Sequence, residues 1–165
     1  MLFLIPARAG SKRLPGKNKR LFCGLPLWMW SWATAERVMS KGDHIMVSTD
    51  DGGISDEYAP LFRPDNLCKD DTPMSAVIDH YFETTAQKSI CLLQPTSPTR
   101  PDSLVRMMIA RGDGCRSVTN GKPNGQCYVY RRGMEMVDVE TEQGHDIDTL
   151  EQFQDAEQDM LRRFT

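Results

Sequence analysis

Three short apolar segments, each followed by a stretch with helical character, constrain the fold of this chain more than any other feature. They are LFLIP at residues 2–6, HIMV at residues 44–47 and SICLLQP at residues 89–95. Short strands without polar alternation are typical of a sheet that is covered on both faces. Strands that alternate with helices run mostly parallel, because each helix carries the chain back across the sheet. We therefore predict an α/β fold with a mostly parallel sheet.

Helix start signals and further strand-like segments extend this pattern along the chain. A proline at the first helical position or, at Thr149 and Gln152, a capping box marks several of the predicted helix starts. The predicted helices cover residues 26–39, 53–59, 73–86, 102–111 and 149–162. Further strands are predicted at residues 115–119, 126–131 and 136–140, with GKPNG at 121–125 as the turn between the first two. The 165 residues are the length of one ordinary domain, so we expect residues 1–165 to form a single domain.

Composition and charge exclude several classes of protein. The five cysteines are odd in number and contain no CxxC pair, and the three histidines lack metal-ligand spacing, which argues against a disulfide framework and a zinc site. No run approaches the roughly 18 apolar residues of a membrane span, so no membrane partner is expected. Residues 7–20, the basic loop, hold six basic side chains and no acid, whereas residues 135–159 hold ten acids and neither lysine nor arginine. Bases confined to one glycine-rich loop, without alternating aromatic residues, favour a small polyphosphate ligand over nucleic acid.

The centre of the basic loop, GSKRLPGKN, follows the first predicted strand, which is where sheets of this kind bind ligands. It is not a P-loop, because Gly10 and Gly16 are separated by five residues rather than four and Asn18 replaces the serine or threonine that ligates magnesium. The dinucleotide fingerprint GxGxxG is absent too. Several cations on a loop with permissive glycines suit a triphosphate whose pyrophosphate must leave. The alternative is a basic loop that is only solvated.

Six motifs, taken together, resemble those of one family. IPARAGSKRLPGKN at residues 5–18 is followed by VSTDD at 47–51, FRP at 62–64, LLQPTSPTR at 92–100, PNG at 123–125 with Tyr128, and DIDT at 146–149. In this order, and over nearly the whole chain, they resemble the cytidylyltransferases that activate acidic sugars, namely the CMP-sialic acid synthetases and their relatives for other nonulosonic acids. The resemblance implies a Rossmann-like three-layer α/β/α nucleotidyltransferase fold. It also implies transfer of CMP from CTP to the anomeric hydroxyl of a 2-keto-3-deoxy sugar acid, with release of pyrophosphate.

The resemblance implies roles for individual residues as well. Those implied to bind the nucleotide are Arg8, Ser11, Lys12, Lys17, Asn18, Arg63 and Thr72, and those implied to bind the sugar are Gln94, Asn124 and Tyr128. The residues implied to act in catalysis are Arg8, Lys17, Asp146 and Asp148. Other interpretations stay open: PNG is also an ordinary turn, Tyr128 could be a core side chain, and Arg63 could lie on the surface. Arg100 could pair with a carboxylate or cap the end of the preceding strand.

Asp146 and Asp148 are the most informative pair. Residues i and i+2 of an extended chain point to the same side, so both carboxylates are expected to share a face while Ile147 packs inward. By resemblance, the pair holds a divalent cation, Mg²⁺ or another such as Mn²⁺, together with substrate phosphates and water. The alternative is that the two acids only favour the N-terminus of the helix that follows.

One departure from the family concerns assembly and substrate. Relatives typically carry a long insertion between the strand at residues 115–119 and PNG, where this chain has only a few residues. We therefore expect a monomer or a dimer with a non-standard interface. The expected substrates are CTP and a small sugar acid, and the expected location is the cytoplasm. Two alternatives stay open: a nucleotide-binding relative without turnover, and a cytidylyltransferase for a different sugar acid, such as an eight-carbon ulosonic acid.

Overall fold

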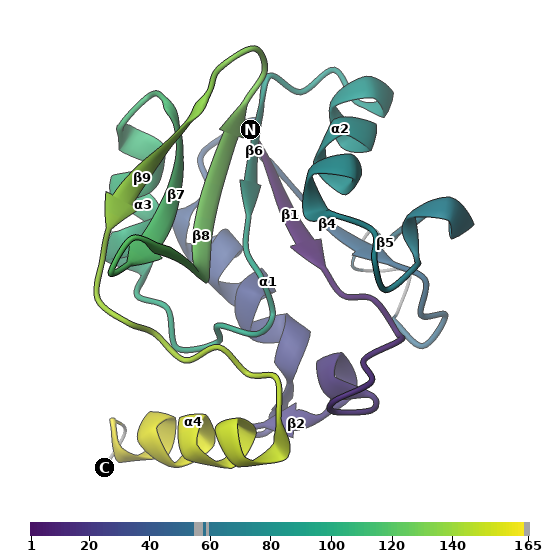
Figure 1. Ribbon diagram of the computed structural model, residues 1–165, viewed down its shortest axis with the longest axis vertical. Coiled ribbons are helices and arrows are strands. Elements are labelled where there is room, and N and C mark those ends of the chain that lie inside the picture. Colours follow the sequence, from purple (N-terminus) through teal and green to yellow (C-terminus); the bar gives the residue numbers. More distant parts are fainter. Residues whose placement is uncertain (55–57, 59, 164–165) are drawn as a thin grey trace.

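The computed structural model describes residues 1–54, 58 and 60–163, which form a sheet with helices on both faces (Figure 1). Within these residues, seven strands form one sheet in the order β5-β4-β1-β6-β8-β7-β9. The strands are β1 (Leu2–Pro6), β4 (His44–Thr49), β5 (Pro60–Phe62), β6 (Ser89–Leu92), β7 (Gly114–Thr119), β8 (Lys122–Arg131) and β9 (Met136–Glu140). The helices are α1 (Leu27–Val38), α2 (Met74–Thr84), α3 (Asp102–Ala110) and α4 (Leu150–Arg162). A two-stranded hairpin of β2 (Leu21–Phe22) and β3 (Leu25–Pro26) forms a separate small sheet.

The seven-stranded sheet is mixed but mostly parallel. β1 runs parallel to both of its neighbours, with Leu2 opposite His44 on β4 and Ile90 on β6. β4 and β5 are parallel as well, and so are β7 and β9. Among the described strands of this sheet, only β8 runs antiparallel to its neighbours, β6 and β7. The predicted α/β fold with a mostly parallel sheet is therefore confirmed.

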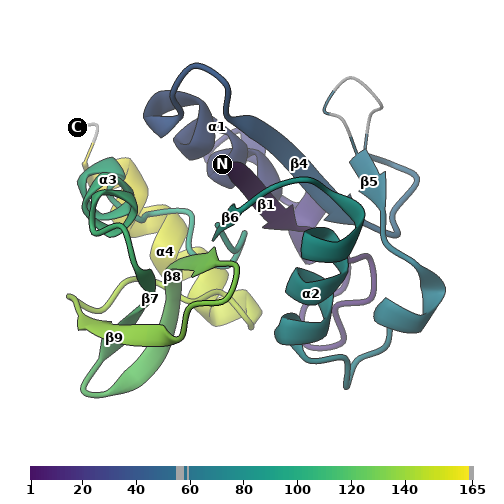
Figure 2. The same ribbon diagram turned by 90° about the horizontal axis from the view of Figure 1, so that it is seen from above.

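The apolar side chains of β1 are divided between the two faces of the sheet. Leu4 packs in a cluster with Ile78 of α2. Phe3 points to the opposite face and packs with Ala35 of α1 and Val105 of α3. Burial of such apolar surface is the main favourable contribution to folding. α2 therefore covers one face and α1 and α3 the other (Figure 2), which confirms the three-layer α/β/α arrangement that the resemblance implied.

The C-terminal helix α4 is fixed both at its start and along its apolar side. Thr149 Oγ1 accepts a hydrogen bond from the Gln152 amide at 3.2 Å, and Gln152 Oε1 accepts one from the Thr149 amide at 2.9 Å. The predicted capping box is therefore confirmed. Phe153 packs in a cluster with Leu14 of the basic loop and Phe22 of β2. This cluster places the start of α4 beside the basic loop (Figure 1).

The predicted turn at GKPNG is wrong, because β8 begins at Lys122 and includes Pro123–Gly125. The hairpin turn is instead Asn120–Gly121, whose φ angles of 52° and 70° are those of a two-residue turn of the I′ type. Pro123 is tolerated in β8 because β6 pairs with β8 only at Tyr128–Arg131, so one edge of β8 has no partner among the described strands at Pro123. β8 thus starts at Lys122, four residues before the strand predicted at residues 126–131.

The helix predicted at residues 53–59 lies mostly outside the described residues. The other predicted helices and strands are found, with boundaries that differ by a few residues. No helix in the described part of the chain is long and apolar enough to cross a membrane.

Candidate functional site

A cavity of about 600 Å³ lies at the carboxyl ends of β1, β5 and β6, where the basic loop and the segment before α4 also meet. This is the position at which sheets of this type bind ligands. All of the predicted site residues except Asn124 and Tyr128 line this cavity, which we call the cleft. Those that line the cleft are Arg8, Ser11, Lys12, Lys17, Asn18, Arg63, Thr72, Gln94, Asp146 and Asp148.

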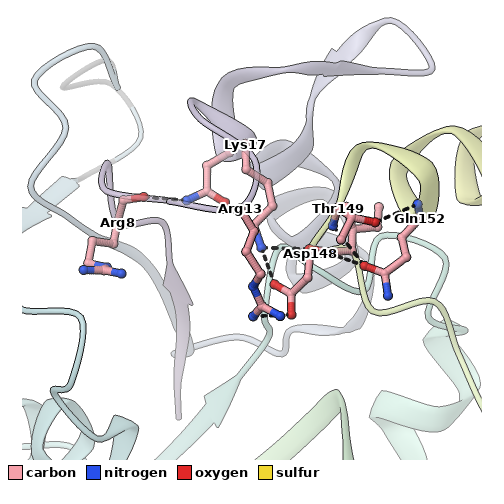
Figure 3. A network of polar contacts seen from close by, with 8 residues as sticks. Arg8, Arg13, Lys17, Asp148, Thr149 and Gln152 are labelled. Atoms are coloured by element: carbon pink, nitrogen blue, oxygen red, sulfur yellow. Dashed lines mark hydrogen bonds and ion pairs between the residues drawn. The ribbon is translucent and has the colours of Figure 1, made fainter.

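Lys17 connects the basic loop to the segment before α4. The side chain is buried, and its Nζ donates hydrogen bonds to Ile147 O at 2.7 Å and to Asp148 Oδ1 at 2.9 Å (Figure 3). Asn18 steadies the loop from within, because its Nδ2 donates to Arg8 O at 2.9 Å. A buried ammonium with two fixed acceptors has little freedom, so Lys17 presents a positioned charge to the cleft.

Asp146 and Asp148 both line the cleft, and Ile147 between them is fully buried, as the i, i+2 spacing predicts. Asp148 Oδ2 pairs with an η-nitrogen of Arg13 at 2.6 Å, so both oxygens of this carboxylate have cationic partners (Figure 3). Sequence reasoning did not single out Arg13. Asp146, by contrast, has no hydrogen-bond or ion-pair partner among the described residues. Asp148 is therefore bound to the basic loop, whereas the Asp146 carboxylate is available to a ligand.

A carboxylate that sequence reasoning missed, Asp70, pairs with two cations of the basic loop. Asp70 Oδ1 lies 2.7 Å from Nη1 of Arg8, and Asp70 Oδ2 pairs with Nζ of Lys12. Arg8 Nη1 also donates to the carbonyl of Cys68 at 2.9 Å. Hydrogen bonds from Lys12 and Arg8 hold the pKa of Asp70 below its usual range. A weak signal existed, because a loop with six bases and no acid can pair with acids from elsewhere in the chain.

Arg63 is buried, which excludes the surface interpretation. Its Nε donates to Ser48 Oγ at 3.0 Å, and its backbone amide donates to Thr49 O at 2.7 Å. Burial lowers the pKa of the Arg63 guanidinium. Arg63 and Thr72 line the cleft on either side of the short 3-10 helix η3 (Asp65–Leu67). Polar groups held in this way can recognise the hydrogen-bonding edge of a ring system.

Gln94 reaches the cleft from the loop after β6, and its backbone is held from two sides. The Gln94 carbonyl accepts hydrogen bonds from Ser31 Oγ, at 3.2 Å, and from an η-nitrogen of Arg100. Arg100 Nε also donates to Ser97 O at 3.0 Å. Burial lowers the pKa of Arg100 to about 10. Of the two interpretations of Arg100, capping the end of the strand is the one that the structure supports, because its hydrogen bonds go to carbonyls.

Asn124 and Tyr128 do not line the cleft, but Tyr128 lies close enough to Asp146 to respond to its charge: burial and the Asp146 carboxylate both raise the pKa of the Tyr128 hydroxyl. Asn124 is only 4% exposed; its Oδ1 accepts from Ser117 Oγ at 2.6 Å and its Nδ2 donates to Thr141 Oγ1 at 2.8 Å. Tyr128 packs in the cluster beneath α2, and its hydroxyl accepts a hydrogen bond from the Gly125 amide at 3.1 Å. The turn interpretation of PNG is excluded, since these residues lie in β8. Both side chains have structural partners in the sheet.

Comparison with known proteins gives a consistent result. A model of a family described as cytidylyltransferase matches residues 2–113. Over 117 residues the chain is 41% identical to CMP-N,N'-diacetyllegionaminic acid synthase of Legionella pneumophila, an alignment that covers 64% of this chain and 50% of that protein. It is 34% identical to pseudaminic acid cytidylyltransferase of Campylobacter jejuni, over 59% of this chain and 46% of that protein. The chain thus spans about half the length of the curated relatives that it matches.

Solved structures share the fold at low sequence identity. The structure of a CMP:2-keto-3-deoxy-manno-octonic acid synthetase complexed with CTP matches with a TM-score of 0.78 and 16% identity, over 98% of both chains. Rv0371c of Mycobacterium tuberculosis, in complex with manganese, matches with a TM-score of 0.62 and 10% identity, over 95% of this chain and 98% of that one. Sequence identities this low show that the fold is shared and nothing more.

Proposed function

This chain belongs to the cytidylyltransferase family, and from that premise we propose that it transfers CMP from CTP to the anomeric hydroxyl of a 2-keto-3-deoxy sugar acid. Pyrophosphate is the second product. The observation that carries the proposal is the single cleft in which the basic loop, Arg63, Gln94 and the pair Asp146 and Asp148 meet. A triphosphate, a base, a sugar and a divalent cation each find suitable side chains there.

The basic loop supplies the charges that a departing pyrophosphate needs. Lys17 is held in place by two acceptors, and Arg8 and Lys12 line the same cleft. Cations fixed before the reaction stabilise charge that develops on the leaving group without having to reorganise. Attack by the sugar hydroxyl on the α-phosphorus needs no nucleophilic side chain. The role of Arg63 and Thr72 is to hold the cytosine end of the nucleotide.

Asp146 and Asp148 fit a divalent cation such as Mg²⁺ or Mn²⁺. Among the described residues, no three His, Cys, Asp or Glu side chains gather closely enough to hold a metal ion, so the protein would supply two carboxylates. This donor set suits Mg²⁺, which commonly takes one or two carboxylates and completes its shell with phosphate oxygens and water. When bound, such an ion lowers the pKa of the acceptor hydroxyl and neutralises phosphate charge. Asp146 is available for it, and Asp148 would have to give up its ion pair with Arg13 to bind the ion.

We assign a nine-carbon sugar acid to the side of the cleft where Gln94 lies. The proteins named above that share most sequence with this chain are a legionaminic acid synthase and a pseudaminic acid cytidylyltransferase. Gln94 can both donate and accept hydrogen bonds, as a polyhydroxylated ligand requires. The alternative is an eight-carbon acid, because relatives at 28–29% identity are 3-deoxy-manno-octulosonate cytidylyltransferases. The reaction would take place in the cytoplasm, where CTP is made.

The decisive experiment is an assay of pyrophosphate release with CTP, magnesium and a panel of eight- and nine-carbon sugar acids. Release that depends on one of these acids supports the proposal and identifies the substrate. A second candidate is a nucleotide-binding protein without turnover, which the burial of Asn124 among hydrogen-bond partners in the sheet favours. Binding of CTP without pyrophosphate release for any acid would establish that alternative instead.

A further inference from the structure

Two cations of the cleft are occupied by a carboxylate of the same chain. Asp70 pairs through one oxygen with Arg8, at 2.7 Å, and through the other with Lys12. Asp70 lies in the loop between η3 and α2, and its side chain is 41% exposed. Its ion-pair partners among the described residues are these two cations, so the contact joins the η3–α2 loop to the basic loop across the mouth of the cleft.

A carboxylate and a phosphate compete for the same donors. Both present oxygens that accept charge-assisted hydrogen bonds from guanidinium and ammonium groups. The Asp70 oxygens take up donors of Arg8 and Lys12 that phosphate oxygens could also use, so a polyphosphate that binds these donors competes with Asp70. Conversely, when pyrophosphate leaves, Asp70 can form its ion pairs with Arg8 and Lys12 again.

We infer that Asp70 is an intramolecular competitor for the phosphates, which limits how tightly Arg8 and Lys12 hold pyrophosphate and so promotes its release. The inference rests on the proposed function, because it assigns pyrophosphate as the leaving group. Asp70 would weaken the affinity for CTP by a similar factor, because the outer phosphates of CTP contact the same two cations. The affinity for CMP would hardly change, because CMP lacks the two phosphates that leave as pyrophosphate. Asp70 thus sets the balance between holding the triphosphate and releasing the product.

The test is a calorimetric titration of inorganic pyrophosphate, and separately of CMP, into the wild-type protein and Asp70→Asn. We expect the variant to bind pyrophosphate about threefold to tenfold more tightly, the range for two partly exposed ion pairs that no longer compete. CMP affinity should change by less than about twofold. Asp138→Asn is the matched control, because Asp138 pairs with Arg116 at 2.6 Å, is 44% exposed and does not line the cleft. It removes the same charge and should leave pyrophosphate affinity unchanged.

A third variant separates competition from a general effect of charge. In a Lys12→Met background only one of the two ion pairs remains, so Asp70→Asn should give a clearly smaller gain in pyrophosphate affinity. An undiminished gain in that background, an equal gain in Asp138→Asn, or no gain in Asp70→Asn would each overturn the inference. Absence of pyrophosphate binding by both the wild type and Asp70→Asn would overturn it as well.

The titration contains no sugar acid, so its result does not depend on turnover. A wild-type protein that releases pyrophosphate from CTP, with unchanged pyrophosphate affinity in Asp70→Asn, would refute the inference alone. Tighter pyrophosphate binding by Asp70→Asn, with no turnover by the wild type for any acid, would refute the proposed reaction alone.

Discussion

At the scale of single residues, the two aspartates beside the cleft have different surroundings. Asp148 bridges Lys17 and Arg13, whereas Asp146 has no partner among the described residues. If both hold the divalent cation, Asp146→Asn and Asp148→Asn should each raise the magnesium requirement and slow transfer by at least roughly 10²-fold. The free energy of unfolding should change by less than about 0.5 kcal/mol for Asp146→Asn. It should fall by about 1–2 kcal/mol for Asp148→Asn, which leaves Lys17 without its anionic partner.

The measurements are the magnesium dependence of the rate and a urea unfolding curve for each variant. Turnover close to that of the wild type in both variants would contradict a metal role. Loss of stability in both variants, with intact turnover, would instead support the interpretation that the acids serve only the helix.

Lys17 and Lys19 allow a matched comparison within the basic loop. Lys17 is buried against Ile147 O and Asp148, whereas Lys19 pairs with Asp51 on the outside. Lys17→Ala should slow transfer by roughly 10²-fold, because its charge is positioned to stabilise the leaving group. Lys19→Ala should have a much smaller effect on the same rate. Equal losses in the two variants would mean that the loop acts as a diffuse patch of charge.

Motif reasoning at this scale identified which residues gather in the cleft but not how they pair. The cleft residues were implied by the family resemblance, and several of them follow predicted strands whose ends a parallel sheet brings to one edge. The partners of Asp70 and Asp148 depend instead on how the basic loop folds back, which no local pattern encodes. Arg13 and Asp70 were therefore missed.

At the scale of elements, the hairpin of β7 and β8 shows the limit of local signals. The sequence contains two Asn-Gly pairs, Asn120–Gly121 and Asn124–Gly125, and either could form a two-residue turn. The fold uses the first and places Asn124 inside β8, where its amide joins Ser117 and Thr141. Strand pairing and buried hydrogen bonds decided between two equal local signals. The start of α4, in contrast, was predictable because its capping box is encoded within four residues.

This arrangement predicts the effect of removing the Asn124 amide. Asn124→Ala should lower the free energy of unfolding by about 1–3 kcal/mol, because it leaves buried hydroxyl groups without their partner. Asn66→Ala, at an exposed position on η3, should change it by less than about 0.5 kcal/mol. Urea unfolding and the Michaelis constant for the sugar acid should both be measured. A raised Michaelis constant with unchanged stability would favour the role in sugar binding that the family resemblance implied.

At the scale of the whole molecule, the chain aligns with about half the length of its curated relatives, and a two-residue turn joins β7 to β8. The large apolar side chains that are exposed lie on several separate elements, including the β2–β3 hairpin, α3, β9 and α4. We therefore expect a monomer, or at most a weak dimer with a non-standard interface. Light scattering at micromolar concentration checks this expectation, and a tight dimer would contradict it.

The central claim is that the cleft joins CMP to a sugar acid, and phosphorus NMR of a reaction mixture tests it most directly. With CTP, magnesium and the acid found in the pyrophosphate assay, we expect a new phosphodiester signal and a pyrophosphate signal to grow in equal amounts. ATP or GTP in place of CTP should give neither signal at a comparable rate. Free CMP without the phosphodiester would show hydrolysis, and equal reaction with all three nucleotides would show that the cleft does not select cytosine. Either result would contradict the account.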